Sequence, residues 1–185
     1  MKLRAETLKS KARDAGVSVE QLAAAVERPG LAGAAAEKAV RNWISGRDYP
    51  RCKSADIEAL AGAVGCSASE IARFVSRVNH HRGSPKKAKL LVDLVRGRGI
   101  DEASDLLRFS TKRAAVNVRK ALEAARADAE EAGADVSALF VAECRIDNGP
   151  HIKRFRPKDR GRAHPILKRT SHITVGLQER EGARF

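Results

Sequence analysis

The sequence has 185 residues, a formal net charge of +13 at pH 7, 43% hydrophobic residues and 4% aromatic residues. The length allows one domain or two small ones, and the hydrophobic content suffices for a buried core. The charge favours a polyanionic partner such as nucleic acid over an anionic membrane surface, because no basic amphipathic helix carries Trp or Phe on one face, and no apolar run approaches a membrane span.

Five short helices are expected in the first 75 residues, because apolar positions recur at helical spacing between Gly and Pro stops. Ser18 and Gln21 match a capping box at the start of the second helix, and Ser54 is expected to cap the fourth. We expect these helices over about 3–15, 19–28, 34–45, 54–64 and 70–73, within an all-α extension that covers residues 1–72.

The segment AEKAVRNWISGRDYP, with the helix and the loop before it, resembles the five-helix helix-turn-helix domain of phage-repressor-type regulators. The resemblance implies that the third helix enters the DNA major groove, with Lys38, Arg41 and Asn42 as candidate contacts. The loop ERPGLAGAAAEK is longer than a tight corner, so we expect it to loosen that helix. Residues 1–75 are also nearly charge-balanced, with 12 basic and 9 acidic side chains. A DNA reader and a docking module that has lost DNA binding both stay open.

The second domain is expected over residues 73–185 and begins with an edge strand at about 74–78. Ser84-Pro85 predicts the start of a helix that ends near Gly97. Asp101 is expected to cap a short helix, and Ser110 or Thr111 a long helix that ends near Glu131. Strand-like segments follow at 139–146 and 173–177. The predicted fold class is α+β, with a β-α-α-α-β-β order, two layers and a long protruding hairpin over about 145–174.

The hairpin segment from His151 to His172 is strongly basic, with eight Lys or Arg residues and a single acid, Asp159. Pro157 and Gly161 mark its far end as a turn. An isolated two-stranded ribbon is at best marginally stable, so we expect a polyanion to hold it. A disordered basic tail is the alternative, but a strand resumes after the segment.

The strings SPKKAKLLVDLVRGRGIDEASDLLRF, KRFRP, GRA and KRTSHITV, in this order, resemble the family of universal large-subunit ribosomal protein twenty-two over about residues 74–177. The resemblance implies a body on the ribosome surface and a hairpin threaded through large-subunit (23S-type) ribosomal RNA, bridging its domains during assembly. The hairpin tip, residues 158–165 (Lys158, Asp159, Arg160, Gly161, Arg162, Ala163, His164 and Pro165), would line the nascent-peptide exit tunnel. Two departures are the bulkier VNHHRGSPKK link and the added N-terminal region.

RNA contacts are expected from basic residues on the body and along the arm, since Arg and Lys bind phosphate and A-form RNA is recognised by shape and backbone. The expected RNA-binding residues are Lys86, Lys87, Lys89, Arg96, Arg98, Lys112, Arg113, Lys153, Arg154, Arg156, Lys158, Arg160, Arg162, Lys168, Arg169 and His172.

No catalytic or metal chemistry is predicted. Ser171 and His172 are adjacent on a strand and so face opposite sides. Cys52, Cys66 and Cys144 have no zinc-site spacing and are expected to be buried free thiols in a reducing compartment. We therefore expect no enzyme, cofactor, metal or small-molecule substrate.

The sequence predicts a cytoplasmic, ribosome-bound structural protein whose partners are ribosomal RNA, neighbouring ribosomal proteins and the passing nascent peptide. The alternative is a DNA-binding transcriptional regulator with a basic nucleic-acid clamp.

Overall fold

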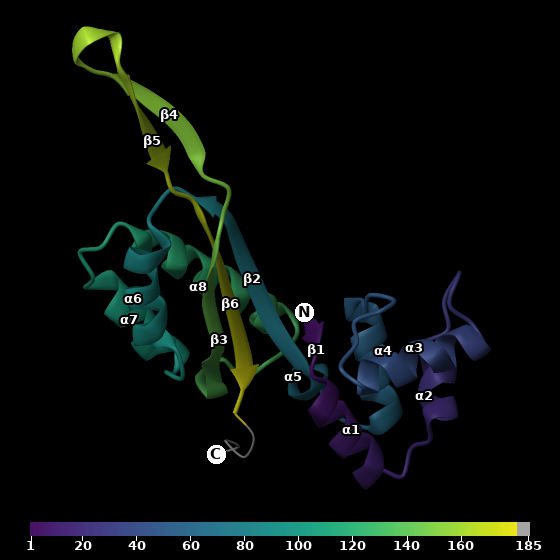
Figure 1. The fold of residues 1–185 in the computed structure, drawn as a ribbon. Helices are drawn as coiled ribbons and strands as arrows, with labels where there is room; N and C mark the ends of the chain where they lie inside the picture. Colours follow the sequence, from purple (N-terminus) through teal and green to yellow (C-terminus); the bar gives the residue numbers. More distant parts are fainter. Residues whose placement is uncertain (181–185) are drawn as a thin grey trace. The chain divides into compact units, whose positions relative to one another are not determined.

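A computed structural model describes residues 1–180 of the chain (Figure 1). The chain divides into two compact units. The N-terminal unit contains residues 1–74, together with 128–135 and the described residues from 178 onward. The C-terminal unit contains residues 75–127 and 136–177. Each unit is described by itself below.

The N-terminal unit is built mainly from five helices with a common apolar core. Leu8, Val40, Ile57 and Leu60 are fully buried, and the Trp43 indole N–H donates to the Pro50 carbonyl oxygen (2.6 Å). The elements are β1 (Lys2–Leu3), α1 (Ala5–Asp14), α2 (Val19–Ala25), α3 (Ala34–Ile44), α4 (Ser54–Val64) and α5 (Ala68–Ile71), and β2 (Ala72–His81) begins in this unit. Five helices are therefore present as predicted, but the fifth ends at Ile71, because Ala72 and Arg73, which were expected in it, begin β2.

Several predicted helix starts in this unit were correct and others were wrong. Ser18 forms the capping box with Gln21. Ser54, however, is the first residue of α4 rather than its cap, because the buried Asp56 carboxylate accepts the N–H of Lys53 (2.8 Å). Leu3 was expected in the first helix but lies in β1, where it pairs with Ala72. This pairing joins segments about 70 residues apart, so local periodicity could not indicate it.

The C-terminal unit is a sheet covered by helices, which confirms the predicted α+β class. Its helices are α6 (Pro85–Val95), α7 (Ile100–Arg108) and α8 (Ala114–Glu131), the last of which ends in the other unit. After the short helix η1 (Val136–Ala138) come β3 (Leu139–Asn148) and β6 (Ser171–Glu179), and the sheet order is β1-β2-β6-β3. Alternate residues of β6, namely Ile173, Val175 and Leu177, are fully buried, which is the period of a strand with one face in a core.

Two helix starts in this unit differ from the prediction. Asp101 lies inside α7, because the helix begins one residue earlier at Ile100 and Gly99 precedes it as the N-cap. The long helix begins at Ala114 rather than just after Thr111. The Ser110 hydroxyl instead accepts the N–H of Lys112 (3.4 Å) in the turn before the helix.

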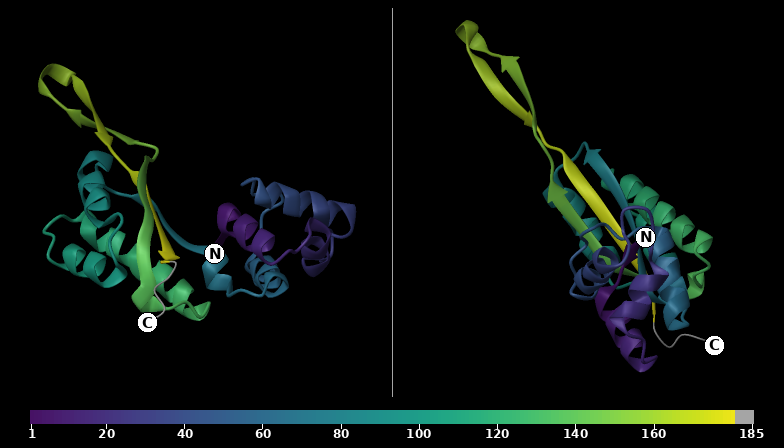
Figure 2. Two further views of the ribbon diagram at one scale, coloured as in Figure 1. Left: turned by 90° about the horizontal axis from the view of Figure 1, so that it is seen from below. Right: turned by 90° about the vertical axis from the view of Figure 1, so that its right-hand side faces the viewer.

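The arm is a separate two-stranded sheet of β4 (Ile152–Pro157) and β5 (Ala163–Lys168), joined by the short helix η2 (Asp159–Gly161). The strands are antiparallel, with register from Ile152↔Lys168 to Pro157↔Ala163. Figures 1 and 2 show the ribbon projecting from the body sheet, beyond the ends of β3 and β6. Every residue from 153 to 169 is exposed, so the arm has almost no core of its own.

The cysteines agree in part with the expectation of buried thiols. Cys52 and Cys144 are buried and free, and burial is the main cause that raises the pKa of each thiol to about 12. Cys66 is only partly buried, and burial is again the main cause that raises the pKa of its thiol.

Candidate nucleic-acid interface

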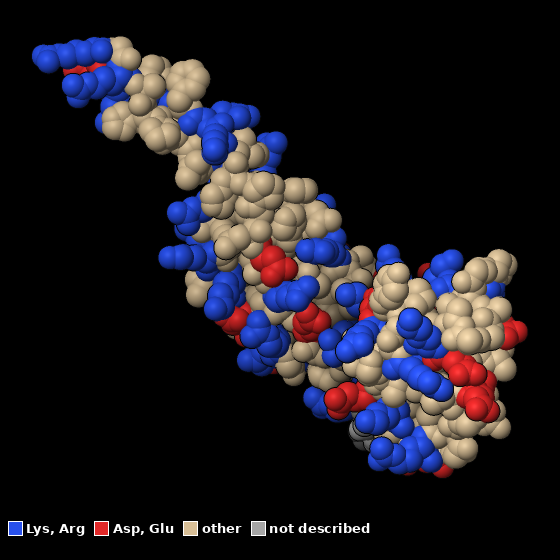
Figure 3. All heavy atoms as spheres, turned by 45° about the vertical axis from the view of Figure 1, so that its right-hand side comes forward, with Lys and Arg blue, Asp and Glu red and all other residues tan. Residues whose placement is uncertain are grey.

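The arm presents a dense set of cations that form no ion pair with the described part of the chain. All eight Lys and Arg side chains between residues 153 and 169 are exposed, and within residues 1–180 none forms an ion pair. In Figure 3 the Lys and Arg atoms crowd the far end of the arm, where acidic atoms are few. Asp159 is the single acid between residues 153 and 169. Like charges held this close repel one another, so the free arm is suited to a polyanionic partner.

The strand register gives the arm two different faces. Residues opposite each other in an antiparallel pair share a face, so Arg154, Arg156 and Lys168 lie with Ile166 and His164 on one side. The other side carries Lys153 with the apolar residues Phe155, Pro157, Ala163, Pro165 and Leu167. Phe155 is 75% exposed and Leu167 52% exposed. One face can therefore bind phosphate while the other offers apolar surface and an aromatic ring.

At the root of the arm, the residues just before β4 pack closely against those just after β5. The Gly149 N–H donates to the Thr170 carbonyl oxygen (3.0 Å), and the buried Thr170 hydroxyl donates to the Pro150 carbonyl oxygen (2.7 Å). His172 is partly buried here: its Nδ1 accepts the His80 N–H (3.3 Å), and the two rings meet edge to face at 4.8 Å. His172 thus helps to hold the root, and a direct contact with RNA stays a prediction.

The body has basic residues at the starts of two helices. Lys86, Lys87 and Lys89 are exposed near the start of α6, and exposed Lys112 and Arg113 precede α8. Neither helix has an acidic residue in its first turn. Because the amino end of a helix carries partial positive charge, these cations do not stabilise the helices. They add to a surface that favours anions.

Arg96 and Arg98, two further predicted RNA contacts, already have partners inside the chain. Arg96 donates to the Cys144 carbonyl oxygen (2.6 Å from Nη2) and pairs with Asp93 (3.3 Å). Arg98 pairs with Glu102 and donates to the Leu94 carbonyl oxygen (3.1 Å). Both side chains are exposed, but contact with a phosphate would compete with these interactions.

The predicted DNA-reading residues in α3 are largely occupied. Arg41 pairs with Glu37 (3.3 Å), and the Asn42 amide donates to the Tyr49 carbonyl oxygen (2.8 Å). Lys38 is exposed. A reading helix needs such side chains free to reach base edges. Of the three candidates, only Lys38 has no interaction with another described residue.

The long loop before α3 makes several contacts with the rest of the N-terminal unit, and the expectation that it loosens this helix stays a prediction. Arg28 pairs with the buried Asp56 (3.2 Å) and donates to the Arg51 carbonyl oxygen (3.3 Å). The Glu27 carboxylate accepts the Gly33 N–H at the start of α3 (3.2 Å). The loop is therefore held at both ends by contacts that its length alone does not reveal.

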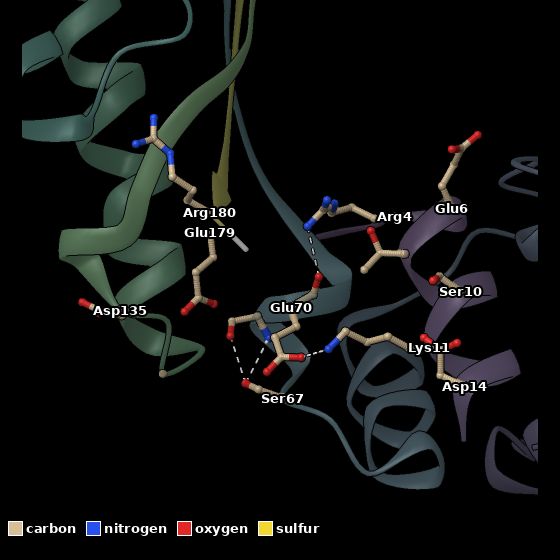
Figure 4. Close-up of a pocket in the computed structure, with 13 residues that line it drawn as sticks. Arg4, Glu6, Ser10, Lys11, Asp14, Ser67, Glu70, Asp135, Glu179 and Arg180 are labelled. Atoms are coloured by element: carbon tan, nitrogen blue, oxygen red, sulfur yellow. Dashed lines mark hydrogen bonds and ion pairs between the residues drawn. The ribbon is translucent and has the colours of Figure 1, made fainter. Parts of the chain in front are cut away.

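The N-terminal unit also contains a hollow of about 950 Å³, which differs in charge from the arm. Figure 4 shows Lys11 of α1 reaching Glu70 of α5, with Ser67 at the start of α5. Five acidic and three basic residues line this hollow, so it does not suit a polyanion. The lining charged residues are Arg4, Glu6, Lys11, Asp14, Glu70, Asp135, Glu179 and Arg180.

Sequence reasoning missed Arg82, which lines a hollow at the root of the arm with Arg154, Lys168 and Arg169. The only local signal was the HHRG string before Ser84.

No helix within residues 1–180 is both long enough and apolar enough to cross a bilayer.

The comparison with protein families agrees with the arrangement of body and arm. Residues 76–178 match the family model described as Ribosomal protein L22p/L17e, and residues 1–75 lie outside this match. The match covers more than half of the chain and includes the three helices α6 to α8, β3, the whole arm and β6 up to residue 178. The chain therefore belongs to the L22 family of ribosomal proteins, which are non-enzymatic components of the large subunit that bind ribosomal RNA.

Proposed function

We propose that the arm threads into large-subunit ribosomal RNA, bridges RNA domains during assembly, and places residues 158–165 at the wall of the nascent-peptide exit tunnel. The observation that carries this proposal is the arm itself, whose eight exposed cations have no ion-pair partner within residues 1–180. A ribbon of this kind is marginal in water. RNA phosphates on the cationic face would supply the stabilisation that the arm lacks.

Salt dependence of binding to 23S-type RNA tests the role of the arm. If all eight cations contact phosphate, the logarithm of the binding constant should fall with the logarithm of salt concentration with a slope of roughly −6 to −7. Replacing Arg154→Gln and Arg156→Gln together should reduce the magnitude of that slope by roughly 1.5.

A matched control removes the same charge from positions already paired with carboxylates. Arg119 pairs with Glu123 (3.2 Å), and Arg145 pairs with Glu143 (3.4 Å). Arg119→Gln with Arg145→Gln should leave the slope nearly unchanged. A wild-type slope near zero, or equal effects of the two double variants, would show that the arm is not the anchor.

The tunnel position of the tip can be tested by cross-linking. A photo-reactive side chain at Arg160 in assembled ribosomes should cross-link to a stalled nascent chain, while the same group at the exposed body residue Lys89 should not. Absence of nascent-chain products at Arg160 would contradict the tunnel position without affecting the RNA-binding proposal.

For the N-terminal unit we propose a docking role on the ribosome surface, against RNA or a neighbouring ribosomal protein, rather than DNA reading. The internal partners of Arg41 and Asn42 support this role. Attachment to an anchored body raises the local concentration of the unit near one patch, so weak contacts suffice. Selection from random duplex DNA with the full chain should yield no consensus. A clear consensus that disappears in Lys38→Ala with Arg41→Ala would favour the regulator alternative.

A further inference from the structure

The hollow at the root of the arm has the composition of an anion site. It has a volume of about 430 Å³ and lies within the C-terminal unit. Four of its lining residues are basic and none is acidic. The lining residues are Arg82, Gly83, Ser84, Ile152, Arg154, Leu167, Lys168, Arg169 and Thr170.

The four cations around this hollow are available to a ligand. Within residues 1–180 none of them forms an ion pair. The Arg154 guanidinium donates through Nη1 to the neighbouring Lys153 carbonyl oxygen (2.8 Å), and its remaining N–H groups can turn to a ligand. Four like charges around one concave space destabilise the empty site. An anion in the hollow would remove that cost.

The backbone at the base of this hollow is held by buried contacts, whereas the ribbon beyond it is exposed. Thr170 is 3% exposed, and its hydroxyl is bonded to the Pro150 carbonyl oxygen. On the opposite wall, Gly83 packs against the buried His81 ring so closely that a Cβ on Gly83 would clash with Nε2. Ser84 then starts the eleven-residue helix α6, and its hydroxyl makes no capping bond. The positive end of α6 adds to the field of the cations.

We propose that this root hollow is a preformed phosphate site that receives backbone phosphate of ribosomal RNA and so sets the direction in which the arm enters the RNA. The proposal rests on the proposed function and adds a defined place where contact begins. Guanidinium groups bind phosphate oxygens through two parallel N–H donors. Arg82 and Arg169 lie outside residues 152–167, next to the folded frame, so their part of the site is present before the arm is ordered, and Arg154 joins it when the arm binds RNA.

The first experiment uses the full-length protein and inorganic pyrophosphate, followed by amide chemical shifts at constant ionic strength. Saturable shifts are expected at Gly83, Ser84 and Thr170. They should disappear in Arg82→Gln with Arg169→Gln and persist in the control Arg119→Gln with Arg145→Gln. Shifts spread evenly along residues 152–168, or equal shifts with chloride, would overturn the phosphate site.

The second experiment identifies the occupant through binding and footprinting on 23S-type RNA. The root variant, Arg82→Gln with Arg169→Gln, should weaken binding at least about tenfold, as expected when two phosphate contacts are lost. It should also remove one backbone footprint. The control variant, Arg156→Gln with Arg160→Gln, should retain that footprint. The root variant could instead keep the affinity and the footprint of the wild type while the native protein binds pyrophosphate. That result would assign the hollow to free polyphosphate and overturn its role in RNA entry. In that case the family function would stand. A native protein that binds no ribosomal RNA would instead refute the proposed function.

Discussion

Replacing Gly149 by alanine is expected to destabilise the root of the arm. A Cβ at this position would lie 2.5 Å from Thr170 Oγ1, 3.2 Å from the Thr170 carbonyl carbon and 3.3 Å from His172 Nε2. The first of these contacts is shorter than real Cβ atoms allow, and the second involves backbone. Gly149 is thus required for the close approach of the two strands.

The structure allows a rough estimate of the cost. The Thr170 hydroxyl can turn away only by losing its hydrogen bond to the Pro150 carbonyl oxygen, at about 1 kcal/mol. The backbone carbon must shift as a whole, and overpacking of this kind costs about 1–3 kcal/mol. We therefore expect Gly149→Ala to lower the free energy of opening the root by about 2–4 kcal/mol.

Amide hydrogen exchange at position 149 and at neighbouring body amides measures this free energy directly. Alanine keeps a backbone N–H, so the bond that Gly149 donates to the Thr170 carbonyl oxygen can be followed in both proteins. Adding Thr170→Ala should relieve the clash, so the double variant should be more stable than the sum of the single changes by at least about 0.5 kcal/mol.

A control glycine should respond in the opposite direction. Gly62 lies inside α4, its φ is outside the left-handed region, and a Cβ added to it would meet nothing within 4 Å. Gly62→Ala should therefore stabilise the N-terminal unit by about 0.5–1 kcal/mol. A loss below about 0.5 kcal/mol for Gly149→Ala, within the range of neutral surface changes, would refute the reasoning about the root.

Three further predictions concern the arm and the body. Without RNA, amides from Ile152 to Leu167 should exchange nearly as fast as unfolded chain while those of α6 stay protected, because the exposed ribbon buries little. Phe155→Ala should weaken RNA binding by about 1–3 kcal/mol if the exposed ring stacks on a base, and Phe155→Tyr should retain the affinity. Burial, and secondarily the charge of Arg113, lower the pKa of His81. The contribution of neutral His81 to the free energy of unfolding should therefore be fully present above the unfolded pKa of about 6.5 and should be lost as the pH falls from there toward the lower folded pKa. His81→Gln should flatten this pH dependence in urea unfolding.

Local patterns in the sequence were sufficient to predict that the helices and the basic arm exist, although several helix starts were misplaced. Apolar residues at helical spacing, the Ser18 capping box and the Ser84-Pro85 start all reflect interactions within a few residues. The arm was predictable because its eight cations and few apolar residues cannot form a core of their own. Its charge favours a polyanionic partner.

Only the tertiary structure decided what each polar side chain is free to do. Arg41 and Asn42 match a reading helix in sequence, but Glu37 and the Tyr49 carbonyl oxygen occupy them. Arg82 became part of a site only because the chain brings it to Lys168 and Arg169, more than 80 residues away. Periodicity and composition report interactions along the chain, whereas a hollow, an ion pair or a close approach such as that at Gly149 depends on which distant segments meet in space.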